Sequence, residues 1–153
     1  MTWIDHAPMA QEKSVLLATA LLLLGMEGSM TAGPTVASVI GDCWKGRNHA
    51  GMSACVEARA KKAQKDLARA ENVASDAIQA SADEPPGFPP YRKEALARLQ
   101  RASRDFSQYV ASECAYQASL AGKGNGAEDV RLACVAVLDE ARAALMSTAR
   151  PVP

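Results

Sequence analysis

The sequence has 153 residues, of which 48% are hydrophobic but only 5% aromatic, and this length supports one domain with a modest core. Lysine and arginine number 17, as do aspartate and glutamate, so the formal net charge is zero, and no long run of like charge is present. This balance argues against a nucleic-acid-binding protein, which would carry a basic patch.

The first predicted element is the apolar run SVLLATALLLLG, from Ser14 to Gly25, which follows Lys13. The run is shorter than the about 20 apolar residues that a transmembrane helix needs, but it matches the core of a secretory signal peptide. We therefore predict that residues 1–37 are a signal peptide with its flanking segment, cleaved near Ala32 or Ala37. A buried core helix or an uncleaved anchor is the alternative.

The chain from Val39 to Gly51 is predicted to be irregular because glycines interrupt it. Trp44 is predicted to cover that end of the core, with a binding role as the alternative. Ser53 can cap the next helix, because its hydroxyl can accept from the exposed amides of a first turn.

The first long helix is predicted at about 52–82, since its apolar residues alternate steps of four and three, as in a coiled-coil seam. The seam consists of Val56, Ala60, Ala63, Leu67, Ala70, Ala74 and Ala77. The basic cluster from Arg59 to Arg69 is interpreted as the solvated back of this helix, and a docking surface is the alternative.

The segment Asp83 to Pro90, DEPPGFPP, ends that helix, because its four prolines forbid helix and hold the loop extended. Such a loop loses little entropy when it is bound. Phe88 and Tyr91 form an apolar tip beside the carboxylates of Asp83 and Glu84, and these four are the candidate partner-binding residues. The alternative is a stiff connector whose aromatic side chains fold back on the helices.

Apolar residues at helical spacing predict two further helices, at about 92–121 and 128–149, on either side of the glycine-broken segment Gly122–Gly126. The inward positions of the two helices are predicted to be Leu96, Leu99, Phe106, Val110, Cys114 and Leu120, then Val130, Cys134, Val137, Leu138, Ala141 and Leu145. The sequence GKGNG is not read as a phosphate loop, because no strand precedes it and no Lys-Ser or Lys-Thr pair opens the next helix.

Four cysteines follow the apolar N-terminal run, an even set of the kind that is oxidised outside the cytoplasm. Cys114 and Cys134 each lie eight positions from the nearer outer glycine (114 to 122, 126 to 134). In an antiparallel hairpin both would therefore sit roughly 12 Å from the turn. Of three possible pairings, Cys114–Cys134 with Cys43–Cys55 closes short loops, and each bridge is expected to contribute about 3 kcal/mol.

After removal of the signal peptide His49 is the only histidine. One histidine is too few for a zinc site, a Ser-His-Asp arrangement or a haem attachment, and the cysteine spacings do not form a redox pair. We predict a protein that is not an enzyme, with no catalytic residue, no metal ligand and no cofactor. The predicted fold class is all-α, a disulfide-stapled antiparallel helical hairpin or three-helix bundle, in a single domain at 38–150.

An aromatic helix that leads into a cysteine, and a glycine loop that leads to a second cysteine, occupy Leu99 to Leu145. The residues that carry this pattern are Phe106, Tyr109, Glu113, Cys114, Cys134, Leu138, Arg142 and Leu145. The segment resembles the LprI-like lysozyme-inhibitor family of small exported bacterial proteins. It departs from the family pattern by having Phe106 in place of tryptophan and Val110-Ala111 in place of Arg-Asp.

The resemblance implies a periplasmic or secreted protein whose partner is a lysozyme, inhibited by steric occlusion of its active-site cleft. A rigid scaffold could place the proline-rich loop over that cleft with a low ordering cost. Arg142 is predicted to anchor one helix to another through a carboxylate such as Glu113 or Asp105, with a solvated arginine as the alternative. The alternative function is an exported helical interaction or structural module for another protein.

Overall fold

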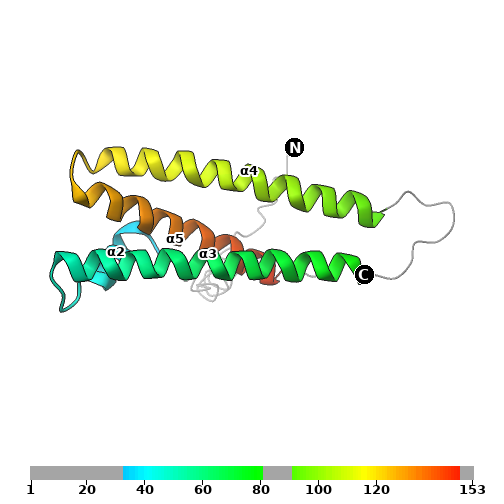
Figure 1. Cartoon of the computed structure of the whole chain (residues 1–153), viewed down its shortest axis with the longest axis horizontal. Coiled ribbons are helices and arrows are strands. Elements are labelled where there is room, and N and C mark those ends of the chain that lie inside the picture. The colour runs from blue at the N-terminus through cyan, green and yellow to red at the C-terminus, as the bar shows by residue number, and fades with distance from the viewer. Residues whose placement is uncertain (1–32, 81–90, 149–153) are drawn as a thin grey trace, which may run out of the picture. The chain divides into compact units, whose positions relative to one another are not determined.

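The structure, a computed structural model of the chain, describes residues 33–80 and 91–148. These residues form four helices and no strand, so the predicted all-α class is confirmed for the described part of the chain (Figure 1). The helices are α2 (Val36–Trp44), α3 (His49–Gln79), α4 (Tyr91–Leu120) and α5 (Asn125–Thr148). None of the described helices is both long enough and apolar enough to span a bilayer.

The first helix of the described residues, α2, lies where the sequence predicted irregular chain from Val39 to Gly51, so that prediction is wrong. A capping box starts α2: the side chain of Thr35 accepts from the Ser38 amide at 3.1 Å, and the Ser38 hydroxyl oxygen accepts from the Thr35 amide at 2.8 Å. Both amides would otherwise lack a helical partner. The cap offsets the roughly 1 kcal/mol by which Gly41 weakens a helix interior.

The start of α3 also differs from the prediction, because Asn48 caps the helix and Ser53 does not. The Asn48 side-chain oxygen accepts from the Gly51 amide at 2.9 Å, so α3 begins at His49 and not near residue 52. Both Asn and Ser are good capping residues, and the sequence could not rank two candidates five positions apart. The other described helix ends lie within three residues of the predicted ones.

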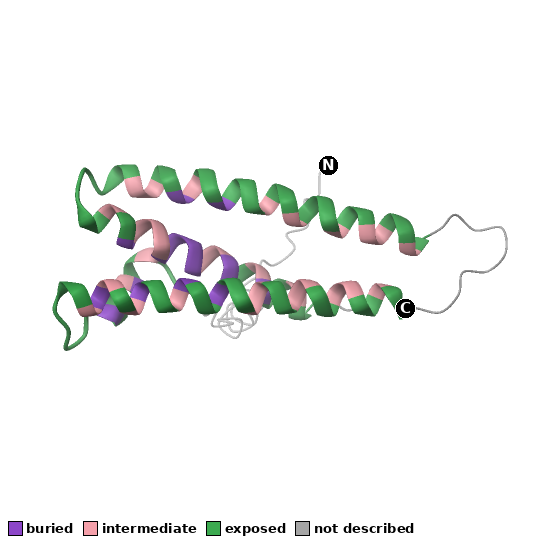
Figure 2. Ribbon diagram, viewed as in Figure 1, coloured by how far each residue is buried: buried purple, intermediate pink, exposed green. Residues whose placement is uncertain are grey.

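The central packing element is α5, which contacts α2, α3 and α4. Figure 1 shows α5 leaving the α4–α5 turn beside α4 and crossing toward α3 along its length. Figure 2 shows that the buried positions concentrate on α5 and on the half of α3 that lies near α2. The core therefore lies toward the end of the helices that carries the α2–α3 and α4–α5 connections.

The buried apolar side chains are small. They are Val39, Cys43, Met52, Val56, Ala60, Ala63, Val110, Cys114, Ala133, Cys134, Val135, Ala136 and Ala143. Alanine lets helices approach closely but removes little apolar area from water, so each contact stabilises the fold only slightly. The predicted seam of α3 is buried as far as Ala63, is partly buried from Leu67 onward and is exposed at Ala77.

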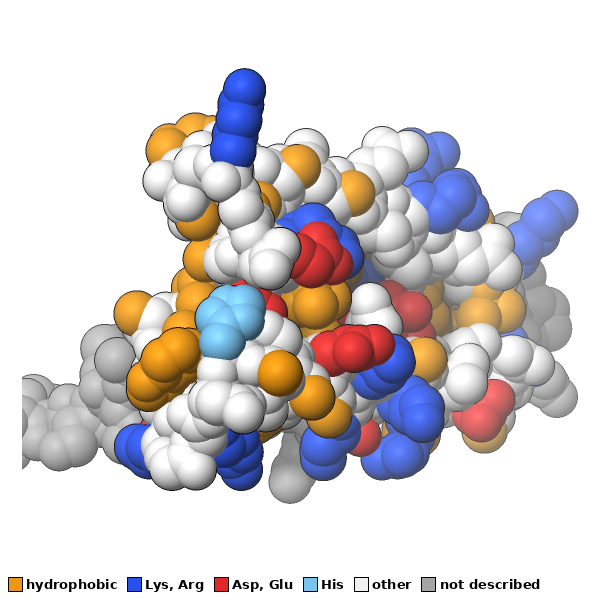
Figure 3. Space-filling model, turned by 60° about the vertical axis from the view of Figure 1, so that its left-hand side comes forward, with side chains coloured by type: hydrophobic (Ala, Val, Ile, Leu, Met, Phe, Trp, Pro, Cys, Tyr) orange, Lys and Arg blue, Asp and Glu red, His pale blue; other side chains and the backbone are white. Residues whose placement is uncertain are grey.

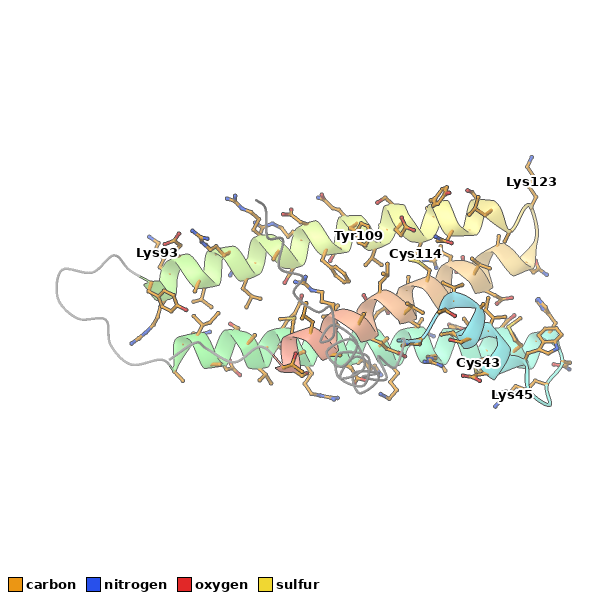
Figure 4. All side chains as sticks on the ribbon, turned by 180° about the vertical axis from the view of Figure 1, so that it is seen from behind. Cys43, Lys45, Lys93, Tyr109, Cys114 and Lys123 are labelled. Atoms are coloured by element: carbon orange, nitrogen blue, oxygen red, sulfur yellow. A yellow bond between two sulfur atoms is a disulfide. The ribbon has the colours of Figure 1, made fainter. Side chains whose placement is uncertain are left out.

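Both predicted disulfides are present. Cys43 is bonded to Cys55 with a Cα–Cα distance of 5.5 Å, and Cys114 to Cys134 with a Cα–Cα distance of 5.4 Å. The first bond joins α2 to α3 and the second joins α4 to α5 (Figure 4). Each bond spans one connection between helices, and both connections lie at the same end of the helices. The two bonds therefore reinforce the thin core at that end.

Candidate functional site

The predicted partner-binding loop lies mostly outside the described residues, which include neither Asp83, Glu84 nor Phe88. Tyr91 is described, as the first residue of α4, and its side chain is 62% exposed. The assignment of partner binding to this loop therefore stays a prediction.

Three positions predicted to face inward do not. Leu120, Ala141 and Leu145 are exposed, and 71% of Leu145 is open to solvent. On α5 the most buried positions are instead Asp129, Ala133, Cys134, Val135, Ala136, Asp139 and Ala143. The prediction followed the larger apolar residues, whereas α5 packs against three helices and turns its small side chains to them, because small side chains allow closer approach.

Arg142 contacts a carboxylate on another helix, but it is Glu71 of α3 and neither of the predicted partners, Glu113 or Asp105. Its Nη2 lies 3.4 Å from Glu71 Oε1 and 3.4 Å from the Ser103 hydroxyl oxygen. Its guanidinium carbon also lies 4.5 Å from the centre of the Phe106 ring, a cation–π distance. One side chain of α5 therefore contacts both α3 and α4.

Asp139 lies one helical turn before Arg142 and is only 5% exposed. The pKa of Asp139 is raised to about 6, mainly by burial and also by the negative charge of Glu71, while Arg142 partly opposes the shift. These residues form what we call the junction cluster, consisting of Glu71, Ser103, Phe106, Asp139 and Arg142. Its ionic contacts are internal to the fold, and we read the cluster as structural.

The other residues that carry the family pattern lie on α4 and α5. Phe106 and Leu138 are partly buried and pack against the core. The ring of Tyr109 lies 6.4 Å from that of Phe106 but is half exposed. Glu113 accepts a hydrogen bond of 2.9 Å from Gln117, its neighbour one turn along α4.

The turn between α2 and α3 is closed by the first disulfide, and we call residues 44–49 the bridged turn. Gly46 adopts a φ of 68°, in the left-handed region that glycine favours. Arg47 folds back, and its Nη1 donates to the carbonyl oxygens of Cys43 at 3.1 Å and Lys45 at 3.4 Å. These bonds satisfy carbonyls at the end of α2, while Asn48 caps α3, so the backbone of the turn is fixed at both ends.

Trp44 at the start of the bridged turn is half exposed, at 49%, so the prediction that it covers the core is wrong. Its ring makes an edge contact with His49, with the ring centres 6.1 Å apart. His49 Nε2 in turn lies 3.3 Å from a carboxylate oxygen of the buried Asp129 on α5. His49 therefore lies between the exposed indole of Trp44 and the buried carboxylate of Asp129.

The bridged turn and the α4–α5 turn lie at one end of the helices. Figure 4 shows Lys45 and Lys123 projecting at this end, far from Lys93 at the other. Figure 3 looks toward the same end and shows the single described histidine, His49, in the foreground beside hydrophobic side chains. Two lysines therefore project from this end, and a histidine and hydrophobic side chains are exposed on it.

A shallow groove between α3 and α5 begins beside His49. Its lining includes Ser53, Glu57, Lys61, Gln64, Glu128, Arg131 and Leu132. The charged groups of the groove pair with each other: Lys61 with Glu57 at 2.5 Å, and Arg131 with Glu128 at 2.8 Å. The hydrogen bond from Arg131 lowers the pKa of Glu128. Asp129, a further carboxylate of the lining, is outside these two pairs and lies beside His49.

A second exposed surface follows α4, where Tyr109, Tyr116 and Leu120 recur at steps of seven and four and so share one side of the helix. Within residues 33–80 and 91–148 no three side chains of the ligand types His, Cys, Asp and Glu are grouped to hold a metal ion.

The described fold is a small helical module with two disulfide bonds. The chain belongs to the LprI family: residues 43–145, more than half of its length, match the family described as "Lysozyme inhibitor LprI". This match confirms the resemblance seen in the sequence. No curated protein matches the chain, and no solved structure does. Family and disulfides are both consistent with a location outside the cytoplasm.

Proposed function

We propose that this protein is exported to the periplasm or secreted, and that it inhibits a lysozyme by binding over the active-site cleft. The family match over residues 43–145 supports a lysozyme as the partner. Inhibition of this kind needs no catalytic group in the inhibitor. Lysozymes cleave polysaccharide with two carboxylates that flank the scissile bond, and a protein that covers them excludes the substrate.

The observation that carries this proposal, beyond the family match, is the rigidity of the scaffold. Two disulfides tie α2 to α3 and α4 to α5, and the Arg142 side chain contacts both α3 and α4. A binding surface that is already ordered loses little conformational entropy on association, which favours a tight complex. The same rigidity would suit an exported module that binds another protein, which is the alternative function.

A direct test combines binding and activity. The purified mature protein is titrated into lysozymes of several structural classes while cell-wall hydrolysis and heat of binding are recorded. We expect stoichiometric inhibition of at least one lysozyme, with loss of inhibition after the disulfides are reduced. Absence of both binding and inhibition throughout the panel would favour the alternative function.

The proposed location has its own test. Cells that produce the tagged full-length protein are fractionated, and the cysteines of each fraction are titrated with a thiol reagent. We expect the protein in the periplasm or the medium, with all four cysteines oxidised. Retention in the cytoplasm with free thiols would contradict export.

A further inference from the structure

We infer that the bridged turn, residues 44–49, is the element that enters the lysozyme cleft, with Trp44 and Arg47 as its main contact residues. This inference rests on the proposed function and names the surface that performs it. It assigns the contact to the end of the helices opposite the proline-rich loop.

Covalent and hydrogen bonds fix the backbone of the bridged turn. The bond between Cys43 and Cys55 closes it covalently, and the nearby core residues Val39, Met52 and Val56 are almost completely buried. The contacts of Arg47 to two carbonyls and the Asn48 cap fix the backbone between them. Because the turn is already ordered, its insertion costs little conformational entropy. Most of the free energy gained from its contacts therefore contributes to affinity.

The exposed residue types of the turn are those that dominate binding energy in protein interfaces. Tryptophan and arginine are enriched among residues whose truncation weakens a complex most. About half of the Trp44 side chain is open to solvent, while its contact with His49 limits the positions of the ring. Binding can therefore bury additional indole surface without reordering the side chain.

The edge of the Arg47 guanidinium that carries Nε and Nη2 is able to bind a carboxylate. Arg47 Nη1 is occupied by two backbone carbonyls, and no described residue pairs with its Nε or Nη2. Arg59 demonstrates the geometry within this protein, because its Nε and Nη2 donate to the two carboxylate oxygens of Glu140 at 2.9 and 3.1 Å. A catalytic carboxylate of the cleft could be held by Arg47 in the same two-point manner.

Charge complementarity favours the bridged turn over the proline-rich loop. At this end of the helices Lys45, Arg47 and Lys123 face two carboxylates, Asp42, which pairs with Lys45 at 2.6 Å, and Asp129, which lies 3.3 Å from His49. Three cations less two anions leave a formal charge of +1. The cleft carries two carboxylates, which attract this end. The loop would instead bring its own carboxylates against them, and like charges in contact disfavour a complex.

The two candidate surfaces cannot both lie in one cleft. They are joined by α3, which has 31 residues and is therefore about 46 Å long. Figure 1 shows the α2–α3 connection at one end of α3, and the proline-rich segment follows the other end of α3 in the sequence. The variants that distinguish them can therefore be tested independently.

The first experiment compares affinities for a lysozyme that the wild-type protein inhibits. Trp44→Ala and Arg47→Gln are each expected to weaken binding at least about 10-fold, as for interface residues of these types. Tyr116→Ala, which truncates an exposed aromatic on α4, is the matched control and is expected to stay within about 2-fold. Circular dichroism and intact mass check that helices and disulfides are retained.

The second experiment needs no change in the inhibitor. A lysozyme whose two catalytic carboxylates are replaced by amides should bind the wild-type protein more weakly if the cationic turn enters the cleft. If the acidic loop entered instead, removing the repulsion should tighten binding. The sign of the change therefore separates the two surfaces even where a turn variant fails to fold.

A third measurement observes Trp44 itself. Fluorotryptophan is incorporated into the mature protein, in which Trp44 is the only tryptophan left once the predicted signal peptide with Trp3 is removed, and its resonance is confirmed by its absence in Trp44→Phe. Addition of the lysozyme should shift this resonance, and a resonance that does not move would overturn the inference. If the wild-type protein inhibits but the turn variants bind normally, only the assignment of the surface fails. If no lysozyme binds, the proposed function fails with it.

Discussion

At the scale of single residues, the charged groups of α5 behave differently from what their sequence positions suggest. Asp129 follows Glu128 near the start of a helix, where a negative charge is usually solvated and favourable, yet Asp129 is buried beside His49. Asp139 is buried as well, next to Arg142. The sequence indicated an anchoring role for Arg142 but not its partner Glu71, because that pairing depends on how α3 packs against α5.

Asp139 makes stability depend on pH. Its pKa is raised to about 6 in the folded protein from an ordinary 3.8, so between these values the folded state binds more protons than the unfolded state. Stability is therefore expected to fall as pH rises from about 4 to about 6, by up to about 3 kcal/mol from this group. Urea unfolding of wild type and Asp139→Asn at pH 4.5 and 7.5 checks this. Equal pH dependence in both proteins would contradict it.

The contact between Arg142 and Glu71 should contribute more to stability than a surface ion pair. Arg142→Ala leaves the partly buried Glu71 without its partner and uncovers the Phe106 ring, so we expect a loss of about 2–3 kcal/mol in the free energy of unfolding. Arg131→Ala breaks the exposed pair with Glu128 and should cost less than about 1 kcal/mol. Similar losses in urea titrations of the two variants would show that the junction cluster has no special role.

At the scale of helices, periodicity predicted α3, α4 and α5 and missed α2. Gly41 and Gly46 suggested irregular chain, and the start of α2 at Thr35 and Ser38 uses two hydroxyl residues in place of the usual Ser/Thr and Glu pair. The helix is held mainly by tertiary contacts of Val39 and by the disulfide at Cys43, which local sequence does not encode. The bridged turn follows from α2, so its form could not be predicted either.

The cap of α2 bears on where the signal peptide is cleaved. Cleavage after Ala37 would remove Thr35 and with it the capping box, whose loss is expected to cost about 1 kcal/mol. Cleavage after Ala32 would leave the whole of α2 and its cap intact. We therefore predict that the exported protein begins at or before Thr35. Intact mass of the purified protein decides between the two sites.

At the scale of the whole molecule, the two disulfides are expected to have separable effects. Replacing either cysteine pair by serines should lower the free energy of unfolding by about 3 kcal/mol, because the loops span 12 and 20 positions and loop entropy varies slowly with length. Only loss of the Cys43–Cys55 bridge loosens the bridged turn. That variant should therefore lose lysozyme affinity, while the variant without Cys114–Cys134 keeps it at temperatures where both remain folded. Thermal melts and calorimetry measure the two effects, and equal affinities would contradict this separation.

The disulfides join the first cysteine to the second and the third to the fourth, so neither loop encloses a cysteine of the other pair. A polypeptide that crosses a membrane with its N-terminus leading presents Cys43 and then Cys55 to an oxidant before Cys114 and Cys134 emerge. An oxidant that couples thiols in their order of arrival therefore makes the native bonds at once. We expect maturation of this protein to depend on a thiol oxidase but not on a disulfide isomerase.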